Sequence, residues 1–518
     1  MVVPELRPWR AARPHVVRFA RTVKPHVARV TRAVRPRSVR ITTPQFTAVA
    51  ATVGLALAAG AVAAAGPWDS TGQRTAERDW AASRDGEGGT DHGRTSASSR
   101  TSPRPAPSAA SVLAGVGGSA GGVPVPTKKA LADVLDPLLD NAALGARRTA
   151  VVVDVATGRR LYAKGADETQ TPASTTKIAT AVAALTAPGP DHRIETRTVL
   201  EPDTKEVVLV GGGDPTLTAR KKADGWADLR TLADRTADAL KSRHLDRVTL
   251  SYDTSLYTGP AQHPIGRNGN LAQVTALMVD EARPGVSVAG PVDRALDPAR
   301  DAADKFAGLL HDRGIETGPP GPSKATARSQ ALASVSSPPL SALVERMLTN
   351  SDNDIAEALA RQVALASGEP ASFAGAAKAI HSRLDKLGLP VSGAEFADGS
   401  GLDRADRISA RLLTALLAEA GDPDHPELRT VLTGLPVAGF TGTLSTRYAD
   451  DPGATGVVRA KTGTLTGVNT LAGTVVDADG RLLAFAFLTS DEAHPPNMDA
   501  ARAALDHTAT ALAACGCR

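Results

Sequence analysis

The chain has 518 residues and a mass of 53.2 kDa, which is too long for one ordinary domain and predicts at least two. Its formal charge of +4 is uneven, because residues 1–45 hold 11 of the 59 Lys and Arg residues but one of the 55 acids. The remainder is mildly acidic and 3% of the chain is aromatic, so we expect no nucleic-acid partner. The two cysteines, Cys515 and Cys517, exclude a disulfide framework, a Cys-rich zinc site and an iron–sulfur cluster, and we expect both to be exposed tail residues.

Next along the chain is an apolar stretch, Phe46–Gly66, which carries no charge and is long enough for an α-helix to cross a bilayer core. The basic residues 1–45 before it predict a cytoplasmic N-terminus, since positive charge gathers on the cytoplasmic side of membrane helices. The small residues Ala61, Ala63 and Ala65 leave a cleaved signal peptide as the alternative, although its basic region would be unusually long. The sequence thus predicts a single-pass membrane anchor with an extracytoplasmic body, or a secreted body if the segment is cleaved.

Residues 67–126 are rich in Ser, Thr, Gly and Pro and have few large apolar side chains, which is typical of a disordered linker. A coil of this length has an average reach of roughly 40 Å. Beyond it we expect a catalytic domain made of residues 127–187 and 326–514. Residues 188–325 differ from this, with short strands and a few helices, one of them expected at 301–314, and are expected to be one or more inserted domains.

The expected elements of the body alternate in a way that indicates an α+β fold. A helix is followed by two strand-like runs separated by a turn, and after the insertion helices return before three further strands and a last helix. We expect the strands to form one five-stranded antiparallel sheet with helices on both faces, interrupted by a large, mostly β insertion. The helices are expected at 130–141, 171–187, 341–367 and 497–514, and the strands at 148–158, 159–167, 457–465, 469–478 and 481–490.

The first motif that carries chemistry is Ser174-Thr175-Thr176-Lys177, an S-x-x-K at the start of an apolar helix. Residues three apart on a helix share a face, so the serine hydroxyl and the lysine amine can meet. An amine enclosed by apolar side chains loses solvation, which lowers its pKa and makes it available as a base toward the hydroxyl. We therefore expect Ser174 to be a nucleophile and Lys177 its base.

Two further motifs lie in the second half of the chain. Ser351-Asp352-Asn353 precedes a helix, where a hydroxyl and an amide can move a proton and hold a peptide carbonyl. Lys461-Thr462-Gly463 lies in an expected edge strand, where the lysine and the threonine hydroxyl can bind a carboxylate and the glycine lets a ligand approach closely. Each motif alone is short enough to arise by chance.

All three motifs occur in the order and contexts that serine penicillin-recognising enzymes require. Together with Gly211-Gly212-Gly213-Asp214-Pro215 and the loop Asp398–Leu402, they resemble the D-alanyl-D-alanine carboxypeptidase/D-alanyl-D-alanine-endopeptidase family, the class C low-molecular-mass penicillin-binding proteins. The resemblance covers about residues 128–514. The long interval between the first two motifs is similar to the inserted domains of that family, and the resemblance implies a serine β-lactamase/transpeptidase-like catalytic fold.

The resemblance also implies roles for single residues. Ser351 would pass a proton to the departing D-alanine nitrogen. Asn353 would hold the substrate amide, and Lys461 and Thr462 its terminal carboxylate. The backbone N–H groups of Ser174 and Thr464 would form an oxyanion hole. The substrate would be a peptidoglycan peptide, β-lactam antibiotics would be covalent inhibitors, and neither a metal nor a cofactor is expected.

Two other functions stay open at this point. A serine β-lactamase shares the acylation residues but needs a device for rapid deacylation, and we find no acidic residue to assign to that role. A catalytically idle module that senses cell-wall fragments would not need Ser174 and Lys177 intact. The Asp398–Leu402 loop lacks the G-x-S-x-G spacing of a hydrolase elbow, so Ser400 is expected to be a turn residue.

Overall fold

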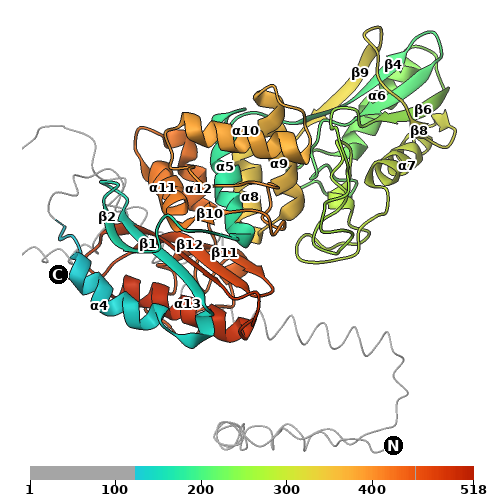
Figure 1. Cartoon of the computed structure of the whole chain (residues 1–518). Helices are drawn as coiled ribbons and strands as arrows, with labels where there is room; N and C mark the ends of the chain where they lie inside the picture. The colour runs from blue at the N-terminus through green and yellow to red at the C-terminus, as the bar shows by residue number, and fades with distance from the viewer. Residues whose placement is uncertain (1–122, 450) are drawn as a thin grey trace, which may run out of the picture. The chain divides into compact units, whose positions relative to one another are not determined.

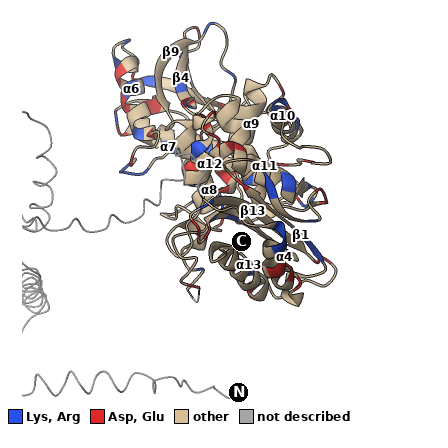
Figure 2. Ribbon diagram, turned by 90° about the vertical axis from the view of Figure 1, so that its left-hand side faces the viewer, with Lys and Arg blue, Asp and Glu red and all other residues tan. Residues whose placement is uncertain are grey.

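The computed structural model describes residues 123–449 and 451–518 (Figure 1). The basic tail, the apolar stretch Phe46–Gly66 and nearly all of the expected linker lie outside these residues. Within the described ranges, no helix has both the length and the apolar character that spanning a membrane requires. Basic and acidic side chains are interspersed over the body (Figure 2), in keeping with its mildly acidic composition.

The main sheet has five antiparallel strands in the order β11-β12-β13-β1-β2, which confirms the expected sheet. Strand β1 joins the two ends of the body, since Arg147 pairs with Ser490 and Asp154 with Leu483 of β13. Strand β11 forms one edge of the sheet. The strands are β1 (Arg147–Asp154), β2 (Arg160–Lys164), β11 (Arg459–Leu465), β12 (Val468–Val476) and β13 (Leu482–Ser490).

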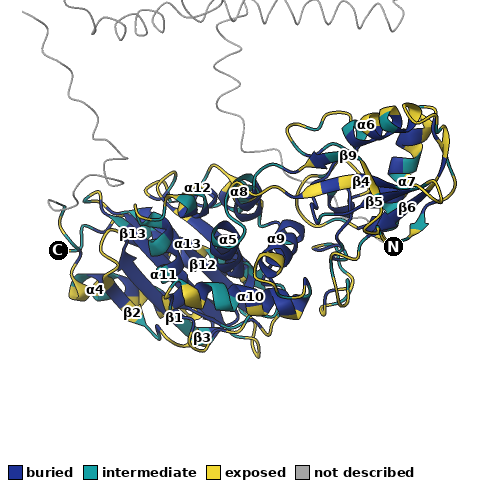
Figure 3. Ribbon diagram, turned by 90° about the horizontal axis from the view of Figure 1, so that it is seen from above, coloured by how far each residue is buried: buried dark blue, intermediate teal, exposed yellow. Residues whose placement is uncertain are grey.

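Helices cover both faces of this sheet (Figure 1), and its strands are largely buried between them (Figure 3), because successive side chains of the central strands enter different cores. Val152 packs with α4 (Lys128–Leu139) and α13 (Met498–Ala513) on one face. Val151 and Val153 pack with the helices of the other face. Those helices are α5 (Thr176–Thr186), α8 (Leu340–Asn350), α9 (Asn353–Ala366), α10 (Phe373–Lys386), α11 (Ala410–Gly421) and α12 (Arg429–Thr433).

A second sheet lies between the first two motifs and has the order β7-β6-β5-β4-β9, with β8 beside β6. We call residues 195–336, from its first to its last strand, the inserted region. Its strands are β4 (Glu195–Glu201), β5 (Glu206–Val210), β6 (Arg247–Asp253), β7 (Glu316–Thr317), β8 (Gly321–Pro322) and β9 (Gln330–Ser336). Because β9 pairs with β4, the second sheet extends past residue 325, where we had placed its boundary.

The inserted region is α/β, so the expectation of mostly β material needs correction. Two helices, α6 (Leu229–Lys241) and α7 (Pro298–His311), pack with its strands around Phe306. The sequence of α6 carries the signal for a helix, since Leu229, Leu232, Ala233 and Leu240 recur at helical spacing and are buried. Strands β5 and β6 run parallel, and the helix between them makes the crossover that parallel strands need.

Helix starts fall where polar residues precede apolar runs. Asp352 accepts a hydrogen bond from the Ile355 amide at the start of α9, and Ser409 accepts one from Leu412 at the start of α11. In contrast, α5 begins without a side-chain cap and follows a 3-10 turn, Ala173–Thr175. Two short strands, β3 (Thr169–Gln170) and β10 (Ile408–Ser409), pair near this turn.

The C-terminal cysteines are not exposed as expected. Cys515 is buried against the core that contains α4 and α13, and a disulfide joins it to Cys517. The carbonyl oxygen of Cys517 accepts a hydrogen bond from the amide of Thr127, which starts α4. The chain therefore ends against the first helix of the body.

Candidate active site

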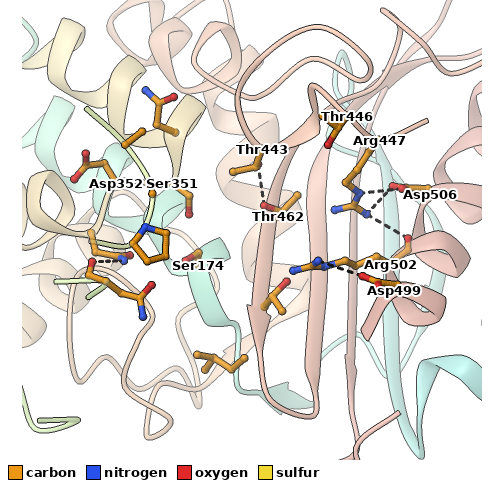
Figure 4. A pocket seen from close by; sticks show the side chains of 18 of the residues that line it. Ser174, Ser351, Asp352, Thr443, Thr446, Arg447, Thr462, Asp499, Arg502 and Asp506 are labelled. Atoms are coloured by element: carbon orange, nitrogen blue, oxygen red, sulfur yellow. Dashed lines mark hydrogen bonds and ion pairs between the residues drawn. The ribbon is translucent and has the colours of Figure 1, made fainter. Parts of the chain in front are cut away.

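The three motifs meet in one cavity of about 780 Å³, shown in Figure 4. Ser174, Ser351 and Thr462 all line it, although they come from different parts of the chain. Asn353 and Thr464 line it too, whereas Lys177 and Lys461 are fully buried behind the lining. Gly463 lies beside them in β11, so the structure brings all eight predicted site residues to one place: Ser174, Lys177, Ser351, Asn353, Lys461, Thr462, Gly463 and Thr464.

Ser174 is held in a tight turn just ahead of α5. The residue before it, Ala173, has a left-handed backbone with φ 48°, which is costly for any residue other than glycine. Two glycines permit the close packing around this turn: a Cβ at Gly401 would collide with the Ala173 carbonyl oxygen, and one at Gly463 would meet the carbonyl oxygen of Pro172. Gly463 thus allows the close approach of β11 to the serine turn, and the approach of a ligand to Gly463 stays a prediction.

Lys177 makes three polar contacts. Its Nζ lies 3.1 Å from Ser174 Oγ and donates to Asn353 Oδ1 and to the carbonyl oxygen of Ser400, both at 2.6 Å. Burial lowers the pKa of Lys177 to about 8, against the opposing effect of the Asp398 charge. A neutral amine has two N–H groups and one lone pair. Since carbonyl oxygens can only accept, they take the two N–H groups, and the lone pair is left for the Ser174 hydroxyl.

Ser351 is the second hydroxyl in the cavity and occupies the left-handed region, with φ 57° and ψ 41°, between α8 and α9. Its Oγ accepts a hydrogen bond of 2.8 Å from Lys461 Nζ, which also donates to the Thr462 carbonyl oxygen at 2.9 Å. Burial, and then the nearby Lys177, hold the pKa of Lys461 well below its usual range. A hydroxyl in contact with a destabilised ammonium group is suited to proton transfer.

Asn353 is engaged on both sides of its amide. Its Oδ1 accepts from Lys177, and its Nδ2 donates to the carbonyl oxygen of Asn270 at 2.9 Å. Asn270 belongs to the inserted region, which therefore reaches the site directly. Sequence reasoning missed Asn270 because its contact uses the backbone and no motif surrounds it.

Sequence reasoning also missed the part that the Asp398–Leu402 loop plays. Ser400 is a turn residue as expected, but its carbonyl oxygen is one of the two that bind Lys177. The carboxylate of Asp398 fixes the turn by accepting from the amides of Ser400, at 2.9 Å, and Gly401. An aspartate two residues before a serine is a recognisable turn signal. It does not predict that the Ser400 carbonyl oxygen binds a lysine 223 residues earlier in the sequence.

Thr462 belongs to β11 and lines the cavity on the side of the sheet. Its hydroxyl lies 2.9 Å from the Thr443 hydroxyl, and both side chains line the cavity (Figure 4). The oxyanion-hole role of the Ser174 and Thr464 N–H groups stays a prediction.

Two groups of buried acids lie near the site, and we considered each as a metal site. Both face arginines: Arg361 lies 3.5 Å from Glu357 in the first, and Arg294 lies 2.8 Å from Asp354 in the second. We therefore interpret the groups as ion-pair networks. Their members are His263, Glu357 and Asp398, and Glu281, Asp352 and Asp354.

Comparison with known proteins agrees with this geometry. Residues 130–296 and 291–512 match the D-Ala-D-Ala carboxypeptidase 3 (S13) family. A carboxypeptidase of Mycobacterium tuberculosis is 36% identical over 426 residues, which cover 80% of this chain and 90% of that protein. The carboxypeptidase DacB of Mycolicibacterium smegmatis is 38% identical over 407 residues, covering 76% and 86%. Among solved structures, penicillin binding protein 4 of Haemophilus influenzae has a TM-score of 0.59 at 22% identity, covers 73% of this chain and 99% of its own, and confirms the expected catalytic fold.

Proposed function

The chain belongs to the D-Ala-D-Ala carboxypeptidase 3 (S13) family and is a serine-type D-Ala-D-Ala carboxypeptidase, and we propose that its reaction proceeds through an acyl-enzyme on Ser174. The observation that carries the proposal is the environment of Lys177. Its buried amine has a pKa near 8, lies 3.1 Å from the Ser174 hydroxyl and has both N–H groups of its neutral form bound to carbonyl oxygens.

The proposed reaction has two steps. Ser174 Oγ attacks the carbonyl carbon of the penultimate D-alanine while Lys177 Nζ takes its proton. The C–N bond then breaks, and the proton that Lys177 took up is passed through the Ser351 hydroxyl to the departing nitrogen, so that D-alanine leaves as a free amine and Lys177 is neutral again. In the second step a water molecule attacks the ester, and Ser174 regains its proton. Lys461 helps to hold Ser351 in place, at 2.8 Å.

We further propose that the substrate is a peptidoglycan stem peptide ending in D-Ala-D-Ala, with its carboxylate bound by Lys461 and the Thr462 hydroxyl. A carboxylate placed beside buried Lys461 would favour the charged form of the lysine and receive a charge-assisted hydrogen bond from it. β-Lactams, whose strained amide can take the place of the scissile bond, would acylate Ser174. The Haemophilus influenzae protein of the same fold bears the name penicillin binding protein, which supports this proposal.

The acylation rate is expected to follow the protonation of Lys177. Because the neutral amine is the base and its pKa is near 8, the rate constant for penicillin acylation should rise with pH below about 8 and level off above it. Rapid-quench measurements with a fluorescent penicillin between pH 5.5 and 9 test this. A rate that falls across this interval would contradict a lysine base.

The cavity also continues beyond Thr462, which supports a second, endopeptidase activity. On that side it is lined by Arg447 and by residues of α13 (Figure 4). Arg447 forms a largely buried bidentate pair with Asp506, at 2.9 and 2.7 Å. Arg502 and Asp499 are more exposed, with 37% and 87% of their side chains accessible and 3.6 Å between them. This part of the cavity thus has a buried ion pair, Arg447 with Asp506, and a more exposed pair, Arg502 with Asp499, whose charged groups a ligand can reach.

A released D-alanine needs little of this space. In a cross-link, however, the departing D-amino acid carries a second stem peptide, and that peptide has charged groups. We propose that the α13 side of the cavity receives the second peptide and that Arg502 binds one of its carboxylates. A charged hydrogen bond at a partly exposed position contributes about 1 kcal/mol, which corresponds to roughly a fivefold change in affinity.

Arg502→Gln is therefore expected to lower kcat/KM for a cross-linked dimer about fivefold and to leave cleavage of a D-Ala-D-Ala pentapeptide within twofold. Arg300→Gln is a matched control, since Arg300 is an exposed helical residue that pairs with Asp304 outside the cavity. Mass analysis of the products from defined muropeptides distinguishes the two activities. If the parent enzyme leaves the dimer intact, the endopeptidase proposal is wrong and the carboxypeptidase activity is unaffected.

For localisation we propose the membrane anchor expected from Phe46–Gly66, with the body outside the cytoplasm. Its support is the sequence alone. Carbonate-washed membranes should retain the full-length protein, whereas a variant that lacks residues 1–125 should be soluble and active. If the full-length gene product instead yields a protein in the culture medium whose N-terminus begins after residue 60, the cleaved signal peptide is favoured.

A further inference from the structure

The inserted region hydrogen-bonds to Asn353 and to Asp398, the two residues through which it reaches the carbonyl oxygens that bind Lys177. One contact is direct: the Asn270 carbonyl oxygen accepts from Asn353, whose own oxygen binds Lys177. The other contact begins at His263, seven residues earlier in the same irregular stretch between β6 and α7. These two contacts place residues 263–270 behind the two groups that orient the lysine.

His263 is 1% exposed, and its Nε2 lies 2.9 Å from Asp398 Oδ2. The amide of Ile265 donates to His263 Nδ1 at 3.2 Å, so Nδ1 acts as an acceptor and Nε2 carries the hydrogen that reaches Asp398. The ring also packs edge-on against Phe373, with centroids 5.1 Å apart. The two hydrogen bonds therefore set the tautomer and direction of the imidazole, and the Phe373 contact packs beside the ring.

Asp398 links His263 to Lys177 through the turn that holds Ser400. Its two carboxylate oxygens accept five hydrogen bonds, all from the turn it starts except the one from His263. The turn presents the Ser400 carbonyl oxygen to Lys177 at 2.6 Å. A continuous chain of hydrogen bonds thus runs from His263 through Asp398 and the Ser400 carbonyl to Lys177 Nζ.

His263 and Asp398, which belong to this series of hydrogen bonds, each shift the pKa of the other against the effect of burial. Burial lowers the pKa of His263, but the Asp398 carboxylate, with Glu357 and Asp403 beyond it, outweighs that effect and raises it. Burial raises the pKa of Asp398, but the bonds from His263 and Gly401 outweigh it and hold it below its usual range. Arg361, which belongs to α9 and stacks on the face of Phe373, adds a positive charge beside these buried acidic residues and His263.

We propose that His263 is a positioning residue for the catalytic base, so that the inserted region holds the Lys177 lone pair toward Ser174. The inference rests on the proposed role of Lys177 and adds to it a requirement for the inserted region. Without the His263 N–H, Asp398 loses one of its five donors and the Ser400 turn loses a support. The amine can then turn its lone pair away from the hydroxyl, and misplacement of a catalytic group by about 1 Å can slow a reaction by up to about a hundredfold.

Three variants separate positioning from mere stability. His263→Leu fills the space of the ring but cannot donate, whereas the side-chain amide of His263→Gln places a donor near the position of Nε2. Phe373→Leu loosens the packing of the imidazole and leaves its bond to Asp398 in place. For each variant of the full protein, we would measure the unfolding temperature and the rate constant for acylation by a fluorescent penicillin between pH 5.5 and 9.

We expect His263→Leu to acylate roughly tenfold more slowly than the parent, His263→Gln to recover most of that loss, and Phe373→Leu to acylate near the parental rate even if it unfolds earlier. The Leu variant also removes the N–H donor that partly offsets the negative charge of Asp398, so the pKa of Lys177 should rise and the acid limb of the profile should move to higher pH. Equal rates and profiles in the parent and His263→Leu would overturn the inference, as would losses that follow the unfolding temperatures of all three variants. A parent enzyme that penicillin does not acylate would instead overturn the proposed function.

Discussion

Replacing Lys177 by arginine is expected to slow acylation of Ser174 by roughly 10²- to 10⁴-fold, the usual contribution of a general base. Arginine keeps the positive charge but does not deprotonate in proteins, so it cannot take the serine proton. The lysine can, because burial lowers its pKa to about 8. The rate constant for labelling by a fluorescent penicillin, measured over seconds to hours, gives the size of the loss.

Lys177→Ala is the matched control for this experiment. If the lysine acts as a base, the Arg and Ala variants should both acylate slowly. If its role were to supply positive charge to the developing oxyanion, the Arg variant would keep much of the parental rate. Fast acylation by Lys177→Arg would move the base role elsewhere, and Lys461, whose pKa is also lowered by burial, would be the next candidate.

Loss of the Ser351 hydroxyl is expected to lower the acylation rate by a similar factor, roughly 10²- to 10⁴-fold. The hydroxyl accepts a 2.8 Å hydrogen bond from Lys461 and lies on the cavity wall, where it can pass a proton to the departing nitrogen. Acylation by a β-lactam also requires that nitrogen to be protonated. Both the peptide and the antibiotic reaction should therefore slow down.

The choice of variant matters here, because Ser351 has a left-handed backbone with φ 57°. Ser351→Gly removes the hydroxyl and also relieves backbone strain of about 1 kcal/mol, whereas Ser351→Ala removes the hydroxyl and keeps that strain. Equal activity losses with different unfolding temperatures would assign the loss to the hydroxyl. Near-parental acylation by the Gly variant would contradict the proton-transfer role.

Much of the catalytic fold could be predicted from the sequence because its signals are local. The apolar run of α5, the strands on either side of the turn after Asp154 and the final strand pair each carry their own periodicity. The strand-like run around Lys461 was expected at a sheet edge, and β11 lies at one edge of the sheet. The inserted region was predicted less well, since α6 was missed and β9 lies past the expected boundary.

The site residues that the sequence did not indicate act through the backbone or over long separations. Ser400 binds Lys177 with a carbonyl oxygen, which every residue possesses, so its identity carries no information about the contact. His263 meets Asp398 across 135 residues, and only the folded inserted region brings the two together. The left-handed backbone at Ala173 likewise arises from the packing of the turn against Gly401, which no local pattern announces.

Mass spectrometry of the penicillin-treated protein tests the central claim, an acyl-enzyme on Ser174, most directly. After proteolysis, the predicted result is one adduct with the mass of the intact antibiotic, on the peptide that contains Ser174, and no adduct in Ser174→Ala protein that unfolds at the parental temperature. An adduct that persists in Ser174→Ala, or that maps to Ser351 or Ser400 in the parent, would contradict the account.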